Sequence, residues 1–130
     1  MPVFTGYLID TDILIDLLRG KQGAHSFLAS LGAPWNISQV SAMELIVGAR
    51  DKKETAMIDR FLANCTVIPF GASAGETAYA LLRDYAKSNG LQVFDSLIAA
   101  TAIEMGLILA SKNRKHFVAI NGLTLEVPEY

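Results

Sequence analysis

Three acidic residues stand where carboxylates could bind a metal ion. Asp10 directly follows the apolar segment 3–9. Glu44 lies early in the segment that follows the apolar run 35–37, and Asp95 begins the segment that precedes the apolar run 107–110. Hard cations such as Mg²⁺ and Mn²⁺ take oxygen ligands, usually one or two carboxylates together with water and substrate phosphates. These residue types indicate phosphate chemistry assisted by a divalent cation, provided that the fold brings the acids together.

Apolar runs of strand length alternate along the chain with longer runs of helical periodicity. This alternation predicts an α/β fold with a mainly parallel sheet covered on both faces, in one domain that spans residues 1–130. We expect strands at 3–9, 35–37, 66–70, 107–110 and 123–127. We expect one helix that ends near Gly20, one that covers 23–31 and one that begins at Ser41. Three further helices are expected at 52–63, 74–88 and 95–105.

The predicted sheet gives the three acids a common place. In open parallel sheets, ligands bind beyond the carboxyl ends of the strands, where successive loops meet. Asp10 would end the first strand, Glu44 would lie in the first turn of the helix after the second strand, and Asp95 would begin the helix before the fourth. We therefore expect all three at one edge of the sheet.

Each acid also has a purely structural interpretation. An acidic residue at a helix start accepts hydrogen bonds from free backbone N–H groups and complements the helix dipole. Asp10 and Asp95 stand where such caps are expected. Ser41 and Glu44 match a capping box, in which the Glu44 carboxylate accepts from the Ser41 backbone N–H. The coincidence of three acids at one edge favours a functional site.

Composition limits the class of protein. Apolar residues make up 52% of the chain, charged residues 18%, and the net charge is −2, so any contact with nucleic acid must depend on local charge. The single cysteine, Cys65, provides neither a disulfide framework nor a zinc site, which favours the cytoplasm. Asp10, Asp12 and Asp16 interrupt the first apolar stretch, and we expect neither a signal peptide nor a membrane span.

Several segments, in order, resemble the motifs of PIN-domain ribonucleases, especially the VapC toxins. Residues 7–16 resemble the opening of these proteins, residues 41–48 their second acidic motif and residues 94–102 their third. Residues 106–111 and 113–117 resemble the two segments that come after the third motif in the family. A single motif would be weak evidence, whereas the ordered series is specific.

The resemblance implies a three-layer α/β/α domain that hydrolyses RNA phosphodiesters with Mg²⁺ or Mn²⁺. By analogy, Asp10 and Asp95 are the primary metal ligands, and Glu44 completes the catalytic pocket. The metal would lower the pKa of a water molecule and neutralise charge on the phosphate. In-line attack by that water would leave a 3′-hydroxyl and a 5′-phosphate. The resemblance also implies an antitoxin partner and a homodimer, which would cover part of the high apolar fraction.

The chain departs from the family in the last motif. His116 stands where a fourth carboxylate is expected, while Asn113 fits the pattern and Ser111 is a mild change. The loss of a negative charge favours a single metal or a preference for Mn²⁺ over Mg²⁺, since imidazole tolerates Mn²⁺ better. His116 has three interpretations: a surface residue, a phosphate contact or a metal ligand. Asp12 either supports the site or only begins a helix.

Two nearby charged groups also have open roles. Asp16 is expected to be a solvated residue that faces Arg19, one turn further along its helix. Lys112, Arg114 and Lys115 form a local basic run near the predicted site. They could bind RNA phosphates or lie in a solvated loop.

Two other functions compete with the ribonuclease. A noncatalytic PIN-like module would bind RNA or protein after His116 had disabled hydrolysis. Alternatively, Asp10 and Asp12 after an apolar strand also resemble the nucleophile motif of haloacid-dehalogenase-like phosphatases, in which Asp10 would be phosphorylated. The phosphatase leaves Glu44 and Asp95 without a role. Within the ribonuclease interpretation, both a toxin and a housekeeping nuclease stay open.

Overall fold

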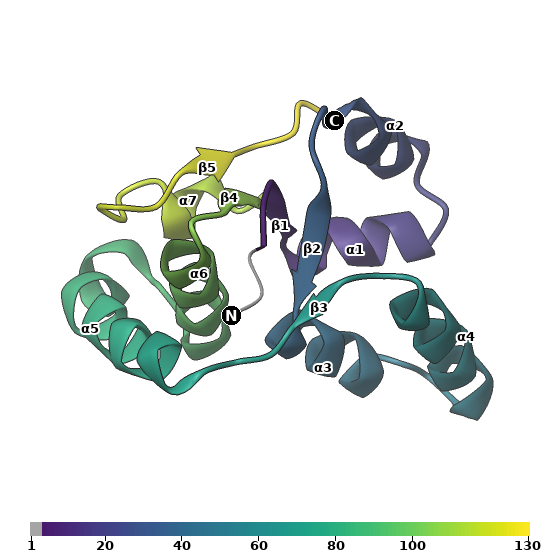
Figure 1. Ribbon diagram of the computed structural model, residues 1–130, viewed down its shortest axis with the longest axis horizontal. Helices are drawn as coiled ribbons and strands as arrows, with labels where there is room; N and C mark the ends of the chain where they lie inside the picture. The colour runs from purple at the N-terminus through teal and green to yellow at the C-terminus, as the bar shows by residue number, and fades with distance from the viewer. Residues whose placement is uncertain (1–3) are drawn as a thin grey trace.

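One parallel sheet organises the chain. The computed structural model describes residues 4–130, with strands in the order β3-β2-β1-β4-β5 and every neighbouring pair parallel (Figure 1). The strands are β1 (Tyr7–Ile9), β2 (Trp35–Ser38), β3 (Val67–Ile68), β4 (Ile108–Ala110) and β5 (Leu125–Glu126). The helices are α1 (Thr11–Leu18), α2 (Gln22–Ser30), α3 (Gln39–Val47), α4 (Lys52–Ala63), α5 (Ala72–Asn89), α6 (Val93–Met105) and α7 (Arg114–Phe117).

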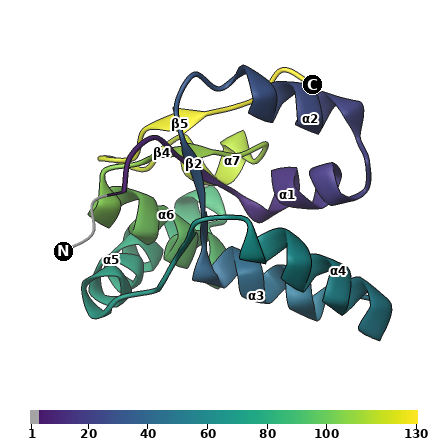
Figure 2. The same ribbon diagram turned by 45° about the vertical axis from the view of Figure 1, so that its right-hand side comes forward.

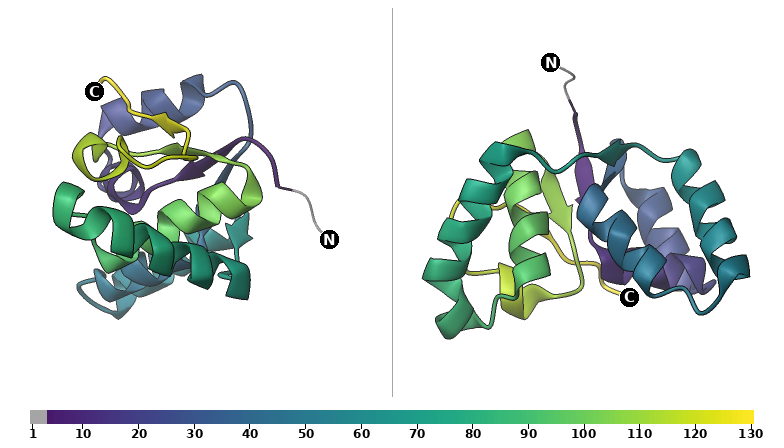
Figure 3. Two further views of the ribbon diagram at one scale, coloured as in Figure 1. Left: turned by 90° about the vertical axis from the view of Figure 1, so that its left-hand side faces the viewer. Right: turned by 90° about the horizontal axis from the view of Figure 1, so that it is seen from below.

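Helices cover both faces of the sheet. Successive residues of a strand point to opposite faces, and here Leu8 and Leu109 pack in one apolar core while Ile9 and Ala110 pack in another. Helices α5 and α6 cover the first core, and α1 and α2 cover the second, so the strands form the middle layer (Figure 3). The expected α/β/α fold with a parallel sheet is confirmed. No helix within residues 4–130 is long and apolar enough to span a membrane.

Strand β1 lies in the middle of the sheet and leads to the first acid. Its Tyr7 pairs with Trp35 of β2 on one side and with Ile108 of β4 on the other. The backbone N–H of Asp10 continues the pairing by donating to the Ala110 carbonyl at 2.9 Å. The residue after β1 is therefore held by the neighbouring strand, and its side chain has a defined direction.

Four of the five strands are shorter than the apolar runs that predicted them, while β2 extends one residue further, to Ser38. Two of them, β3 and β5, contain only two residues each, and β1 begins at Tyr7, while Val3 lies outside the described residues. Apolar periodicity reports burial, whereas a strand also needs a neighbour in register. Helix α7 was not expected, because a four-residue element is too short for a periodic pattern. Gly90 and Gly106 end α5 and α6 in the left-handed conformation, as their positions predicted.

The predicted capping box at Ser41 is wrong. Helix α3 begins at Gln39, and the Ser38 hydroxyl accepts from the Ser41 backbone N–H at 3.0 Å. Ser41 therefore lies inside the helix, and Glu44 is in its second turn. The Glu44 carboxylate instead accepts a hydrogen bond from the Thr11 hydroxyl at 2.7 Å. A tertiary partner on α1 replaces the local partner that the motif predicted.

Candidate active site

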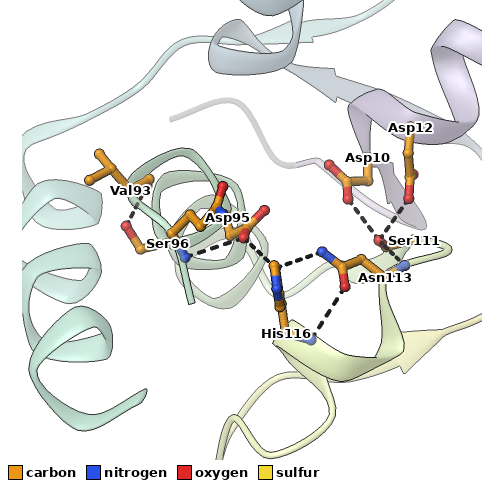
Figure 4. A network of polar contacts seen from close by, with 9 residues as sticks. Asp10, Asp12, Val93, Asp95, Ser96, Ser111, Asn113 and His116 are labelled. Atoms are coloured by element: carbon orange, nitrogen blue, oxygen red, sulfur yellow. Dashed lines mark hydrogen bonds and ion pairs between the residues drawn. The ribbon is translucent and has the colours of Figure 1, made fainter. Parts of the chain in front are cut away.

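Asp10 is the most deeply buried acid of the site, with 6% of its surface exposed. One carboxylate oxygen accepts from the Thr11 backbone N–H at 2.8 Å, and the other accepts from the Ser111 hydroxyl at 2.7 Å (Figure 4). Burial, followed by the charge of Asp12, raises the pKa of Asp10 to about 7, although both hydrogen bonds oppose the rise. The charge of Asp95 adds to it. Asp10 therefore occupies a place where an added cation would be favourable.

Glu44 reaches the site through Thr11. The Thr11 hydroxyl donates to Glu44 Oε1 at 2.7 Å and lies 2.9 Å from the Ser41 hydroxyl. Thr11 follows Asp10 directly, so α1 and α3 meet beside the buried carboxylate. The structure links Glu44 to the residue that follows Asp10, and the Thr11 hydroxyl orients the Glu44 carboxylate.

Asp12 lies in the first turn of α1 and also contacts the segment after β4. One of its oxygens accepts from the Ile13 backbone N–H at 2.7 Å, as expected for an acid at a helix start. The other accepts from the Lys112 backbone N–H at 3.0 Å, which ties α1 to the segment after β4. Burial raises the pKa of Asp12, and the charge of Asp16 adds to this effect, while hydrogen bonds from the Ile13 and Lys112 N–H groups oppose it. Asp12 supports the position of the site and adds negative charge beside Asp10.

Asp95 faces a histidine from α7. Its Oδ2 lies 2.8 Å from His116 Nδ1 and accepts weakly from the Gln92 backbone N–H at 3.3 Å. Nδ1 can donate to the carboxylate in one tautomer of the imidazole and can accept from the Asn113 amide in the other. Asn113 lies 2.7 Å from the same nitrogen through its side-chain amide, and it caps α7 (Figure 4). His116 is therefore no surface residue, since it holds Asp95.

The expectation for Asp16 is wrong. Its carboxylate faces the Lys112 ammonium at 2.6 Å and accepts from the Tyr130 hydroxyl at 2.9 Å, and its side chain is 14% exposed. Burial by itself raises the pKa of Asp16, but hydrogen bonds from Lys112 and Tyr130 outweigh it and lower that pKa. The helical spacing suggested Arg19, whereas the tertiary fold supplies stronger partners. The Lys112 ammonium is thus paired with the Asp16 carboxylate.

Ser111 and Tyr130 have roles that no local pattern indicated. Ser111 stood out only as a mild departure within a motif, although its hydroxyl contacts the deepest acid of the site. A serine that follows a buried strand and aligns with the acid after a neighbouring strand is the pattern that could have found it. Tyr130 lies far from every motif, and only the fold places it beside α1.

The donor set fits a hard divalent cation. The site consists of carboxylates and hydroxyls, and the raised pKa of Asp10 shows that its negative charge lacks a nearby positive partner. Within residues 4–130, no group of three or more His, Cys, Asp or Glu side chains lies close enough to share one ion. Magnesium sites commonly use one or two carboxylates and complete the shell with water and phosphate. The charge of Asp95 reaches Asp10 and helps to raise its pKa, so these two carboxylates are near neighbours in the site.

Known proteins resemble this chain along most of its length. Residues 7–123 match the PIN domain. Ribonuclease VapC10 of Mycobacterium tuberculosis is 40% identical over 113 residues, which cover 85% of this chain and 84% of that protein. Ribonuclease VapC1 of Rickettsia felis is 33% identical, over 91% of this chain and 92% of that protein. A toxin–antitoxin complex from Klebsiella pneumoniae contains a chain with 31% identity and a TM-score of 0.78, over 91% of this chain and 95% of that one.

Proposed function

The chain belongs to the PIN-domain family, and we propose from this membership that it is a metal-dependent endoribonuclease, the toxin of a toxin–antitoxin pair. Ribonuclease activity is supported by the names of its relatives and by the ordered motifs of this chain that resemble those of the family. The observation that carries the assignment is the buried Asp10, held beside Glu44 and Asp12 at the end of the central strand. The family match favours a nuclease over the phosphatase alternative.

We propose Mg²⁺ or Mn²⁺ as the cofactor, with Asp10 and Asp95 as the residues that hold it. A bound divalent cation supplies an activated water and charge neutralisation at the phosphate. The protein's own contribution is orientation: Ser111 and Thr11 direct the Asp10 carboxylate, and His116 directs that of Asp95. Glu44, placed by Thr11, completes the acidic pocket beside Asp10.

The basic residues that remain free on α7 are candidates for RNA contact. Arg114 and Lys115 are exposed and lie on the same short helix as His116. They would bind phosphates without reading sequence. Lys112, which was equally a candidate, is held by Asp16.

We propose an antitoxin protein as the partner, because the Klebsiella relative is part of a toxin–antitoxin complex. We also propose a homodimer in the cytoplasm. Large apolar side chains that lie exposed on α3 support a dimer, notably Val47 at 85% exposure and Met43 at 58%. An interface with a second copy would cover such side chains.

The test is cleavage of end-labelled RNA by the purified protein. Transfer RNAs and other structured RNAs are incubated with the wild type in Mg²⁺, in Mn²⁺ and in chelator, alongside Asp95→Asn. We expect cleavage that requires metal and falls by at least about 100-fold in the variant, because it loses a charge that orients the cofactor. The variant also controls for contaminating nuclease, since it is purified in the same way.

The alternatives give different results. End-group analysis should find 3′-hydroxyl and 5′-phosphate products, and a 2′,3′-cyclic phosphate would contradict attack by water. If the wild type and Asp95→Asn are equally inert in both metals but bind RNA with equal affinity, the noncatalytic binding module replaces the ribonuclease.

A further inference from the structure

The last residue of the chain packs against the helix that begins at the active site. The Tyr130 hydroxyl donates to Asp16 Oδ2 at 2.9 Å, and its ring centroid lies 6.4 Å from that of Phe27 on α2. The chain end lies beside α2 in two views (Figures 1 and 2). Gly23 makes this possible, because a Cβ there would come within 2.8 Å of the Tyr130 ring. The ring therefore occupies a space that a glycine leaves open.

Lys112 joins Tyr130 and Asp16 in one cluster. Its ammonium lies 2.6 Å from Asp16 Oδ2 and 5.3 Å from the centroid of the Tyr130 ring. Asp16 thus receives two hydrogen bonds on one oxygen, both from residues that are distant in sequence. Such a charge-assisted arrangement restricts the Lys112 side chain more than an isolated surface pair does.

The same lysine reaches the acidic site through its backbone. The Lys112 N–H donates to Asp12 Oδ2 at 3.0 Å, and the preceding residue, Ser111, donates its hydroxyl to Asp10 Oδ2 at 2.7 Å. The Ser111 hydroxyl oxygen in turn accepts from the Asn113 N–H at 3.0 Å. Residues 111–113 therefore hold two of the site's acids, and the Lys112 side chain ties these residues to α1.

We propose that Tyr130 and Asp16 are positioning residues for the nuclease site, acting through Lys112. They hold the Lys112 side chain, and this contact holds the 111–113 segment in the place where Ser111 orients Asp10. The inference rests on the proposed function, since the consequence of a misplaced Asp10 is weaker metal binding and slower cleavage. It also assigns Lys112 to the support of the site and not to the RNA.

The test compares Tyr130→Phe with Tyr79→Phe. Tyr130→Phe removes one hydroxyl and keeps the ring, while Tyr79 is 67% exposed on α5 and serves as the matched control. Mn²⁺ affinity is measured by electron paramagnetic resonance titration, and kcat and KM are measured on an RNA that the wild type cleaves. We expect Tyr130→Phe to weaken Mn²⁺ binding by about 10-fold and to lower kcat while KM for RNA stays unchanged. Tyr79→Phe should behave as the wild type.

A conservative pair at Lys112 separates positioning from general stability. Lys112→Arg keeps a cation for Asp16 and should retain most of the Mn²⁺ affinity, whereas Lys112→Met should lose it to the same extent as Tyr130→Phe. Wild-type Mn²⁺ affinity and kcat in both Tyr130→Phe and Lys112→Met would overturn the inference, even if their melting temperatures fall. A higher KM at unchanged kcat in Lys112→Met would overturn it too and would assign the lysine to RNA. If the wild type itself neither binds Mn²⁺ nor cleaves RNA, the proposed function fails first.

Discussion

At the scale of single residues, the site is defined by charge that the fold leaves without compensation. Asp10 is buried at the end of the central strand, next to Asp12 and within the influence of Asp95. Its partners are a neutral hydroxyl and a backbone N–H, which orient the carboxylate but carry no positive charge. Carboxylates that ionise unfavourably are typical of functional sites. They lower the free energy of unfolding, but they are already placed to bind a ligand.

The first prediction concerns the stability of the metal-free protein. The pKa of Asp10 rises from 3.8 to about 7 on folding, so between these pH values the native state binds more protons than the unfolded state, and stability falls as pH rises. Asp10→Asn removes this penalty, which is about 1.4 kcal/mol per pKa unit. In chelator, the variant should therefore melt at a higher temperature than the wild type at pH 8, with a smaller difference at pH 5. A difference that is independent of pH would contradict the raised pKa.

The second prediction concerns His116 and metal preference. By the resemblance, His116 stands where a fourth acid is expected, and its Nδ1 lies 2.8 Å from Asp95 Oδ2, so we expect the wild type to be more active in Mn²⁺ than in Mg²⁺. His116→Asp adds a hard oxygen ligand, and we expect the ratio of Mn²⁺ to Mg²⁺ activity to fall by several-fold. The measurement is the initial rate of RNA cleavage across a titration of each metal. An unchanged ratio would show that position 116 does not influence the metal.

At the scale of elements, α1 and α3 present their acids through specific helix starts. Asp10 directly follows β1 and caps α1, while Ser38 is the last residue of β2 and caps α3. In each case the cap lies at the end of a strand, so the direction of the helix is tied to the sheet. This coupling carries Glu44, in the second turn of α3, toward Thr11 on α1.

The third prediction compares two helix caps. Ser38 caps α3 beside the site, and Asp51 caps α4 at the surface, where its carboxylate accepts from the Glu54 N–H at 2.8 Å. Replacing either residue with alanine should lower the free energy of unfolding by about 1 kcal/mol, as measured by urea denaturation. Only Ser38→Ala should also lower kcat, because only α3 carries Glu44. Equal loss of kcat in both variants would show that activity follows stability and not the position of α3.

At the scale of the whole molecule, the two faces of the sheet contribute different parts of the site. The layer of α1 and α2 supplies Asp12 and Asp16, while the opposite layer supplies Asp95 from α6 and His116 from α7. The charges of Asp12 and Asp95, from opposite layers, both raise the pKa of Asp10 just beyond the end of β1, the edge at which parallel sheets place their ligands. The exposed apolar side chains Met43 and Val47 of α3 form the surface that we propose for a second copy.

The fourth prediction tests the proposed homodimer. Met43 and Val47 are four residues apart on α3 and so share one side of the helix. A glutamate at Val47 would introduce an uncompensated charge into an apolar interface. Sedimentation velocity should therefore show a dimer for the wild type and a shift toward monomer for Val47→Glu. Val118→Glu, at a site that is 56% exposed near α7, is the control. A wild type that stays monomeric at tens of micromolar would contradict the proposal.

The sequence by itself determined the elements and the acids that they carry. Helical spacing, strand-length apolar runs and the glycines at positions 90 and 106 depend on neighbours within a few residues, so they are readable locally. The prediction of α4 as Lys52–Ala63 matches the structure residue for residue. The parallel α/β/α architecture follows from the alternation of these elements. Asp10, Glu44 and Asp95 were predicted as site residues because the expected sheet places them at one edge and because their motifs resemble those of the PIN family.

Only the tertiary structure decided which side chains those acids meet. Ser111 contacts Asp10 across 101 residues, and Tyr130 contacts Asp16 across 114. The Glu44 carboxylate accepts from the Thr11 hydroxyl and not from the Ser41 backbone N–H, the local partner that the sequence predicted. Such contacts depend on the register of β1 against β4 and on how the helices pack on the sheet, where shifts of an ångström or two break a hydrogen bond. Local periodicity carries no information about that register, so the sequence predicted the acids but not the groups that orient them.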